Sequence, residues 1–291
     1  YTLDTVAPVA VSVTSSDATA GYLNAADGTV SLSVSGSDAA EITSVKVYDA
    51  FGNSATGTLN SGAYDFATSG LTDGALRVEV VQEDAAGNVT TVENALTLTL
   101  DTSTEVTIST DAATVGAASQ VISGVAEAGS TVVISGGTSN VTVTAGADGT
   151  WSDSVTLSAE GSNTLTATVT DLAGNTSTDT VALTLDTTNP TVTITTTDIA
   201  TNSETQTIAG TVDAGHYGAT VKVYEGDNLL TTVVSDSSDG SWSATVPLST
   251  NGSHTLTATA EDAAGNTHSA TITYTLDTVA PVAVSVTSSD A

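Results

Sequence analysis

The stretch TLTATVTDLAGNTSTDTVALTLDT, residues 164–187, decides the fold of this chain. Apolar and polar residues alternate over 164–170 and again over 177–185, which predicts two β-strands that each bury one face. Between them, Asp171-Leu-Ala-Gly174-Asn175 has the composition of a tight turn. The stretch therefore predicts an antiparallel strand pair that closes a β-sandwich.

Leu-Asp-Thr ends this stretch and recurs along the chain at Asp4, Asp101, Asp186 and Asp277, with spacings of 97, 85 and 91 residues. Each interval suits one sandwich domain. We predict modules over 1–100, 101–185 and 186–276, with the first strand of a further repeat over 277–291. No Gly/Ser spacer separates them, so we expect the modules to abut closely.

Short alternating runs with Gly, Asp and Asn between them fill each module. In the second module they predict strands near 105–110, 120–126, 130–136, 140–145, 151–157, 164–170 and 177–185. Seven such strands favour an immunoglobulin-like Greek key. The expected fold is all-β: three tandem immunoglobulin-like Greek-key β-sandwiches in an extended rod, with each module about 35–45 Å long.

One tryptophan in each of the last two modules follows an Asp-Gly turn. Trp151 follows Asp148-Gly149, and Trp242 follows Asp239-Gly240. A single aromatic residue at a fixed distance from a turn is expected to anchor the core at the start of a strand. The alternative is a side chain that stacks on a sugar.

The composition of the 291 residues is strongly acidic, with 33 Asp and Glu against 3 Lys and Arg, a formal charge of -30 and no cysteine. Nucleic acid is excluded as a partner because no basic cluster can neutralise phosphates. We expect no direct membrane insertion, since no apolar run approaches a membrane span. With 39% hydrophobic residues the chain can cover a core. Self-repulsion of the acids makes a divalent cation the expected missing component.

Residues 274–291 repeat residues 1–18 letter for letter. This identity predicts that the chain is cut from a longer protein in which a unit of 273 residues recurs. Selection for tandem copies acts on length and reach rather than on one catalytic pocket. We therefore expect a mechanical function and neighbouring repeats as partners.

Each module carries Asp-x-x-Gly-Asn before its last strand, beginning at Asp84, Asp171 and Asp262. Taken alone, the motif is a hairpin loop in which Asp caps the turn and Gly adopts a positive φ. Counting strand directions places this loop, the loop between the second and third strands, and the entering linker at the same pole of the module. The acids expected to meet there are Asp4, Asp38 and Asp84, with Glu41 as a substitute for Asp38; Asp101, Glu127 and Asp171; and Asp186, Asp213 and Asp262.

Three carboxylates in one place, with almost no Lys or Arg to pair them, repel one another strongly. Calcium resolves this repulsion because it takes six to eight oxygen ligands. We therefore predict Ca²⁺ at the junctions, bound by these nine acids. Acids screened by solvent, with no ion, are the alternative.

At this point the chain resembles the tandem bacterial Ig-like domains of giant adhesins exported by type 1 secretion, many of them of the repeats-in-toxin (RTX) type. The T-L-D-T linkers, the D-G-x-W turns and the T-A-T-x-x-D-x-A-G-N segments at 166–175 and 257–266 carry this resemblance. It implies calcium bound by the linker and loop Asp residues. The first module departs from the pattern, because Tyr64-Asp65-Phe66 stands where the D-G-x-W turn is expected.

The resemblance also implies a function and a location. It implies a calcium-rigidified spacer, a monomeric rod that projects a distal binding tip from the bacterial surface and supports adhesion or biofilm formation. The parent protein is expected to be extracellular and anchored in the outer membrane.

The rival interpretation is a glycan- or protein-binding module that acts through its polar loops. Only 4% of residues are aromatic, which disfavours a concave recognition site. No enzyme is expected, because His216, His254 and His268 form neither a nucleophile-base pair nor a metal-ligand spacing. Threonine-rich strands also invite an ice-binding interpretation, but a solvent-facing strand accounts for them.

Overall fold

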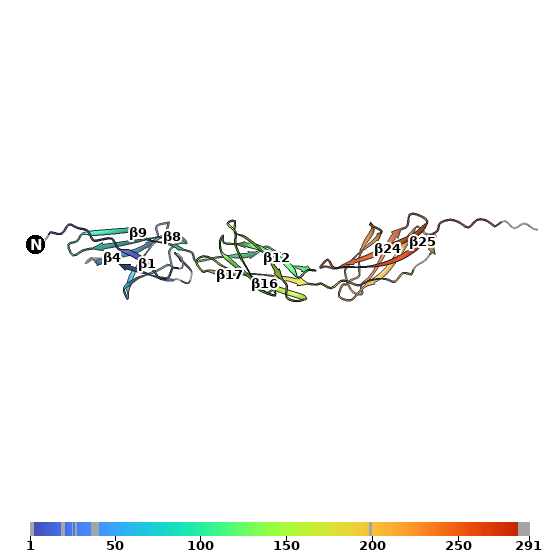
Figure 1. Ribbon diagram of the computed structural model, residues 1–291, viewed down its shortest axis with the longest axis horizontal. Coiled ribbons are helices and arrows are strands. Elements are labelled where there is room, and N and C mark those ends of the chain that lie inside the picture. The colour runs from blue at the N-terminus through green and yellow to red at the C-terminus, as the bar shows by residue number, and fades with distance from the viewer. Residues whose placement is uncertain are drawn as a thin grey trace, which may run out of the picture. The chain divides into compact units, whose positions relative to one another are not determined.

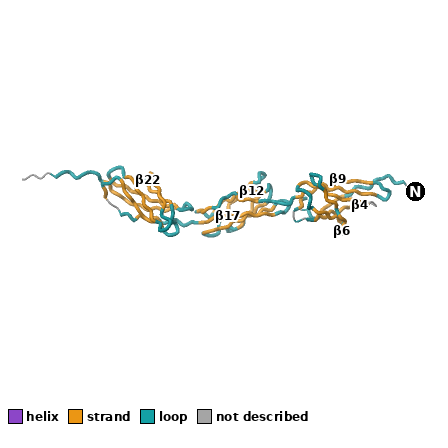
Figure 2. Tube along the Cα trace, turned by 180° about the vertical axis from the view of Figure 1, so that it is seen from behind, coloured by secondary structure: helices purple, strands orange, loops and turns teal. Residues whose placement is uncertain are grey.

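The computed structural model describes residues 3–18, 21–24, 26, 28–35, 41–197 and 200–284. Throughout this described part the chain consists of strands joined by turns and loops, as Figure 2 shows, and it contains no helix that is long and apolar enough to cross a membrane. The chain divides into two compact units. One unit is Tyr1–Asp111, Val121–Thr156 and Thr164–Val181, and the other is Ala112–Gln120, Leu157–Asn163 and Ala182–Ala291.

The first group of strands is β1 (Ser12–Ser15), β2 (Tyr22–Leu23), β3 (Thr29–Ser35), β4 (Glu41–Tyr48), β5 (Ser54–Thr56), β6 (Thr58–Asn60), β7 (Ala63–Ala67), β8 (Gly74–Glu83) and β9 (Val89–Leu100). They form two sheets, in the orders β1-β3-β7-β6 and β2-β9-β8-β4-β5. Leu32 and Val78, one from each sheet, are fully buried in the core between them.

The second group is β10 (Val106–Ile108), β11 (Ala113–Val115), β12 (Ser119–Ala126), β13 (Thr131–Ser135), β14 (Val141–Thr144), β15 (Thr150–Thr156), β16 (Gly161–Thr170) and β17 (Thr176–Leu185). Their sheets have the orders β10-β12-β15 and β11-β17-β16-β13-β14. The seven predicted strands are all present, and Figure 1 labels β12, β16 and β17 among them. The prediction of an all-β immunoglobulin-like sandwich is confirmed.

The third group is β18 (Val192–Ile194), β19 (Ala200–Thr201), β20 (Thr205–Val212), β21 (Thr220–Glu225), β22 (Asn228–Val234), β23 (Ser241–Pro247), β24 (Gly252–Glu261) and β25 (Thr267–Leu276). Its sheets, β18-β20-β23 and β19-β25-β24-β21-β22, repeat the strand order of the second group. Alternation explains the core: Leu256, Ala258 and Ala260 on β24 are fully buried, while the threonines between them are not.

In each of the last two sandwiches a tryptophan packs against a glycine on the neighbouring strand, and this contact explains the presence of both residues. Trp242 on β23 is 4% exposed and lies opposite Gly210 on β20. A Cβ at Gly210 would lie 1.9 Å from the carbonyl oxygen of Thr193, so no other residue fits there. Trp151 and Gly124 repeat the arrangement, which confirms the core-anchor interpretation.

The first sandwich fills the same region differently. Phe66 on β7 lies opposite Val30 on β3 and is 2% exposed. The core therefore closes without the Asp-Gly-x-Trp turn, since Phe66 supplies the buried ring.

A short strand missed by the periodicity analysis accompanies the last strand of each sandwich. Strand β11 pairs in parallel with β17, and β2 and β19 pair likewise with β9 and β25. Two or three residues are too few to show an alternating pattern. These short strands end beside the departing Leu-Asp-Thr linker.

Candidate metal centres at the Leu-Asp-Thr linkers

The Asp-x-x-Gly-Asn loop is built as a capped turn. In the second sandwich the Asp171 carboxylate accepts the Asn175 backbone N–H at 2.8 Å and the Asn175 side-chain amide at 2.9 Å. Gly174 adopts φ 92°, which an L-residue rarely does. Asp84 with Asn88 and Asp262 with Asn266 make the same bonds. The local interpretation of the motif as a turn is therefore correct.

The asparagine of each loop also holds the linker that enters its own sandwich. The side-chain amide of Asn175 donates to the carbonyl oxygen of Asp101 at 2.8 Å, and that of Asn266 donates to Asp186 at 2.7 Å. Asn88 makes the longer equivalent to Asp4, at 3.3 Å. The loop before the last strand thus lies beside the entering linker, as the strand directions predict.

Two of these linker aspartates, Asp101 and Asp186, are also bound through their backbone N–H to the short strands β2 and β11. Asp101 donates to the carbonyl of Leu23 at 2.9 Å, and Asp186 donates to that of Val115 at 3.0 Å. The backbones of Asp101 and Asp186 are therefore held from both sides, by the N–H and by the carbonyl.

The linker threonines are bound by side chains that the sequence analysis missed. Thr102 donates its N–H and its hydroxyl to the carboxylate of Asp73, at 3.2 and 2.9 Å. Thr187 is bound in the same way by Glu160, and Thr278 by Asn251. In the sequence, each of these binding side chains is the Asp, Glu or Asn directly before the glycine that begins β8, β16 or β24, and this shared position could have indicated them.

The second linker brings its three predicted acids together. Asp101, Glu127 and Asp171 each place one carboxylate oxygen within 4.8 Å of the others, and Asp171 is buried. Burial raises the pKa of Asp101, and the neighbouring carboxylates of Asp171 and Asp73 raise it further. Partial desolvation raises the pKa of Glu127, with Asp101 and Asp171 adding to it. A cation at this position would relieve the repulsion.

The third linker assembles a different group. One ring nitrogen of His216 lies within 4.8 Å of carboxylate oxygens from Asp186 and Asp262. The predicted third acid, Asp213, lies next to this group, and its two oxygens lie 3.1 and 3.2 Å from His216 Nδ1. Asp213 also accepts the N–H of Thr191 at 2.5 Å. His216 was not predicted as a ligand. Its position three residues after Asp213 is the feature of the sequence that could have indicated it.

Electrostatics at the third linker differ from those at the second. Hydrogen bonds from the hydroxyl and the N–H of Thr188 lower the pKa of Asp186. Burial raises the pKa of Asp213, but bonds from Thr191 and His216 outweigh it, so the net shift is downward. These acids are thus already stabilised as carboxylates.

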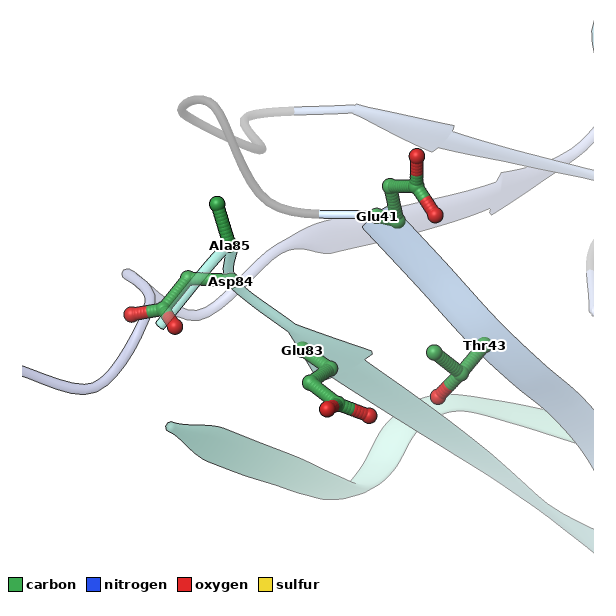
Figure 3. Close-up of a pocket in the computed structure, with 5 residues that line it drawn as sticks. All are labelled: Glu41, Thr43, Glu83, Asp84 and Ala85. Carbon is green, nitrogen blue, oxygen red and sulfur yellow. The ribbon is translucent and has the colours of Figure 1, made fainter. Parts of the chain in front are cut away.

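At the first linker, Asp38 lies outside the described residues. Hydrogen bonds from Asn88 lower the pKa of Asp84, and Asp4 is exposed. Glu41, Glu83 and Asp84 line one pocket, but Figure 3 shows their carboxylates pointing in different directions. Within the described part of the chain, these acids do not converge as those of the second linker do.

A fourth Asp-x-x-Gly-Asn motif, Asp49-Ala-Phe-Gly-Asn53, lies between β4 and β5 and was missed in the sequence. The Asp49 carboxylate is buried and accepts Phe51 N–H at 2.9 Å, Asn53 N–H at 2.9 Å and the Asn53 amide at 2.7 Å. Thr72 adds its N–H at 3.0 Å and its hydroxyl at 2.7 Å. Although burial raises the pKa of Asp49, these bonds hold it far below its usual range.

The sequence model of the bacterial Ig-like domain matches residues 107–187 and 194–278. The chain belongs to this family. Bacterial Ig-like domains are structural, non-enzymatic folds, which agrees with the prediction that the chain is not an enzyme. No curated protein matches the chain.

Several solved structures of adhesins resemble this bacterial Ig-like chain. A tetra-tandem repeat in the extending region of a large adhesion protein is 24% identical, with 92% of this chain and 74% of that one covered at a TM-score of 0.32. A Ca²⁺-stabilised adhesin of an Antarctic bacterium is 28% identical, with 92% and 74% covered at 0.34. A 1.5-MDa bacterial ice-binding adhesin is 25% identical, with 94% and 100% covered at 0.39.

Proposed function

We propose that this chain is a calcium-rigidified structural spacer of a bacterial adhesin. The observation that carries the proposal is the meeting of Asp101, Glu127 and Asp171, one from a linker and two from loops of the sandwich that follows. Six to eight oxygens around Ca²⁺ at 2.3–2.6 Å allow ligands about 4.8 Å apart to share one ion. Such an ion would fix the linker side chain to the next sandwich.

The hydrogen bonds of the linker backbone support the same function. Asp101 is held by Leu23 on one side and Asn175 on the other, so a cation on its side chain adds a third attachment. Calcium would act on a joint that is already positioned, which lowers the ordering cost of binding.

The predicted sites at Asp4, Asp38 and Asp84, and at Asp186, Asp213 and Asp262, belong to the same proposal, in which a divalent cation stiffens each linker. Calcium and the neighbouring repeats are the proposed partners of a monomeric rod. The proposed location is the bacterial cell surface, in a secreted adhesin of RTX type anchored in the outer membrane, where length supports adhesion and biofilm formation. The module boundaries at 100, 185 and 276 are part of the proposal.

Small-angle X-ray scattering of the chain in Ca²⁺ and in EDTA tests this function. Three sandwiches of seven-residue strands in line give an expected maximum dimension of roughly 110–130 Å in Ca²⁺. EDTA is expected to broaden the distribution of distances, because linkers between small interfaces act as hinges. Asp111→Asn, an exposed acid outside the clusters, serves as the control and is expected to behave as wild type. A profile that chelator leaves unchanged would contradict the proposal.

A further inference from the structure

We propose that the third cluster, Asp186, His216 and Asp262, is a site for a transition-metal dication of the Zn²⁺ class rather than for calcium. The inference deepens the proposed function, on which it rests only for the placement of a cation at this linker. It assigns different ions to two neighbouring linkers of one chain.

The donor atoms carry the argument. The second cluster, Asp101, Glu127 and Asp171, offers carboxylate oxygens alone, which are hard ligands that suit Ca²⁺. The third cluster replaces one of these oxygens with an imidazole nitrogen of His216. Imidazole is a preferred ligand of Zn²⁺ and other late first-row dications, and carboxylates complete such sites.

The surroundings of His216 fit this role. Its side chain is only 11% exposed, so the ring is held among its neighbours rather than free in solvent. Asp213 approaches Nδ1 with both carboxylate oxygens, at 3.1 and 3.2 Å. A carboxylate against the imidazole is the arrangement that orients metal-binding histidines and increases their basicity. Asp213 is in turn fixed by the N–H of Thr191.

The site is also poised to receive an ion. Asp186, His216 and Asp262 are each partly exposed, so a hydrated cation can reach them. Asp186 belongs to the linker, while His216 and Asp262 belong to loops of the sandwich that it enters. A dication here would therefore join linker and sandwich, as calcium is proposed to do at Asp101.

Isothermal titration of the full chain with Zn²⁺ in excess Ca²⁺ tests the assignment. Wild type is expected to bind one equivalent through this cluster. His216→Gln is expected to lower the affinity by roughly 100-fold or more, and Asp213→Asn by roughly 10- to 100-fold. His268→Gln is the matched control, since His268 is exposed on the same sandwich outside the cluster, and it should bind as wild type. Circular dichroism checks that each variant is folded.

Two outcomes separate this inference from the proposed function. If Ca²⁺ raises the melting temperature but Zn²⁺ binding is absent, is abolished by Ca²⁺, or is the same in wild type and His216→Gln, the zinc site is overturned and the spacer function stands. If Zn²⁺ binds through His216 while Ca²⁺ changes neither melting nor scattering, the spacer function fails and the zinc site stands.

Discussion

Two loops of this chain share one motif and differ in what surrounds it. In both the Asp49–Asn53 and the Asp171–Asn175 loop, the Asp carboxylate accepts the backbone N–H and the side-chain amide of the Asn four residues later. At Asp49, Thr72 fills the remaining capacity with two more donors. At Asp171, two further carboxylates lie there instead. The motif builds a turn, and its neighbours decide whether a cation is needed.

The pKa shifts record this difference. Donors around Asp49 stabilise its charge and lower its pKa, whereas the groups around Asp171 raise the pKa of Asp101 and Glu127. The Asp49 carboxylate, with five donors from its own sandwich, gains little from a metal ion, while the three converging acids at Asp171 gain from one.

The largest effect is expected from Asp49→Asn. The new amide places a donor against the Thr72 and Asn53 donors, so the first sandwich should melt on the order of 10 °C lower. The loss should be equal in Ca²⁺ and EDTA. Calorimetry of the chain in Ca²⁺ and in EDTA checks this, and a loss of melting temperature that depends on calcium would contradict the proposed difference between the two loops.

Asp171→Asn, the same change in the other loop, should add a calcium-dependent loss to a local one. The new amide opposes the side-chain amide of Asn175, which costs about 1–2 kcal/mol in either buffer. The calcium-dependent gain of about 2.7 kcal/mol at 100 times Kd should be lost at this linker as well. In EDTA the removal of one repelling charge offsets part of the local loss, so the deficit should be smaller there than in Ca²⁺. A thermal scan in both buffers decides, and a deficit equal in the two buffers would argue for a purely structural Asp171.

Asn175→Ala should give a smaller change of about 1–2 kcal/mol, since the amide bonds both Asp171 and the carbonyl of Asp101. Calcium affinity should fall with it, because the linker is less well positioned. Asn53→Ala is the matched control, and it should leave calcium titrations unchanged. Equal calcium affinity in wild type and Asn175→Ala would show that the linker is positioned by other contacts.

The smallest effect concerns pH, measured in EDTA. Asp49 has a lowered pKa, so its contribution is present above its unfolded pKa of about 3.9 and is lost as the pH falls below it. Glu127 has a raised pKa, so its contribution is present below about 4.3 and is lost as the pH rises through the folded value. At neutral pH, Asp49→Asn should therefore destabilise and Glu127→Gln should stabilise. The Glu127→Gln difference should shrink as the pH falls toward 4, whereas the Asp49→Asn difference should shrink only below about 3.9. Melts of the two variants from pH 7 to 3 check this, and differences of equal sign at pH 7 would contradict the electrostatic account.

The fold and the second cluster followed from the sequence because strand order fixes which loops share a pole. Alternation indicates the long strands, and the directions of these strands place Asp101, Glu127 and Asp171 at one pole, where the three carboxylates meet. Both predictions depend on where the strands lie and in which direction they run, and the alternation of apolar and polar residues indicates the strand positions.

What the sequence could not predict depends on side-chain direction. The strand pattern does not indicate that the Asp213 carboxylate contacts His216, or that Thr72 donates two hydrogen bonds to the Asp49 carboxylate. The pairing of Thr102 with Asp73 joins residues 29 positions apart, and only the folded chain brings them into contact. Short strands such as β11 escape prediction for another reason, because three residues are too few to show an alternating pattern.

The parallel pairing of β11 with β17 bears on how a sandwich responds to tension. Ala113 to Val115 lie beside Leu183 to Leu185, and the two strands run in the same direction near opposite ends of the module's sequence. A pull on the two ends of the module draws these strands past each other along their length. The hydrogen bonds between them then bear the force together in shear instead of opening one after another, so each sandwich resists being unravelled from its ends.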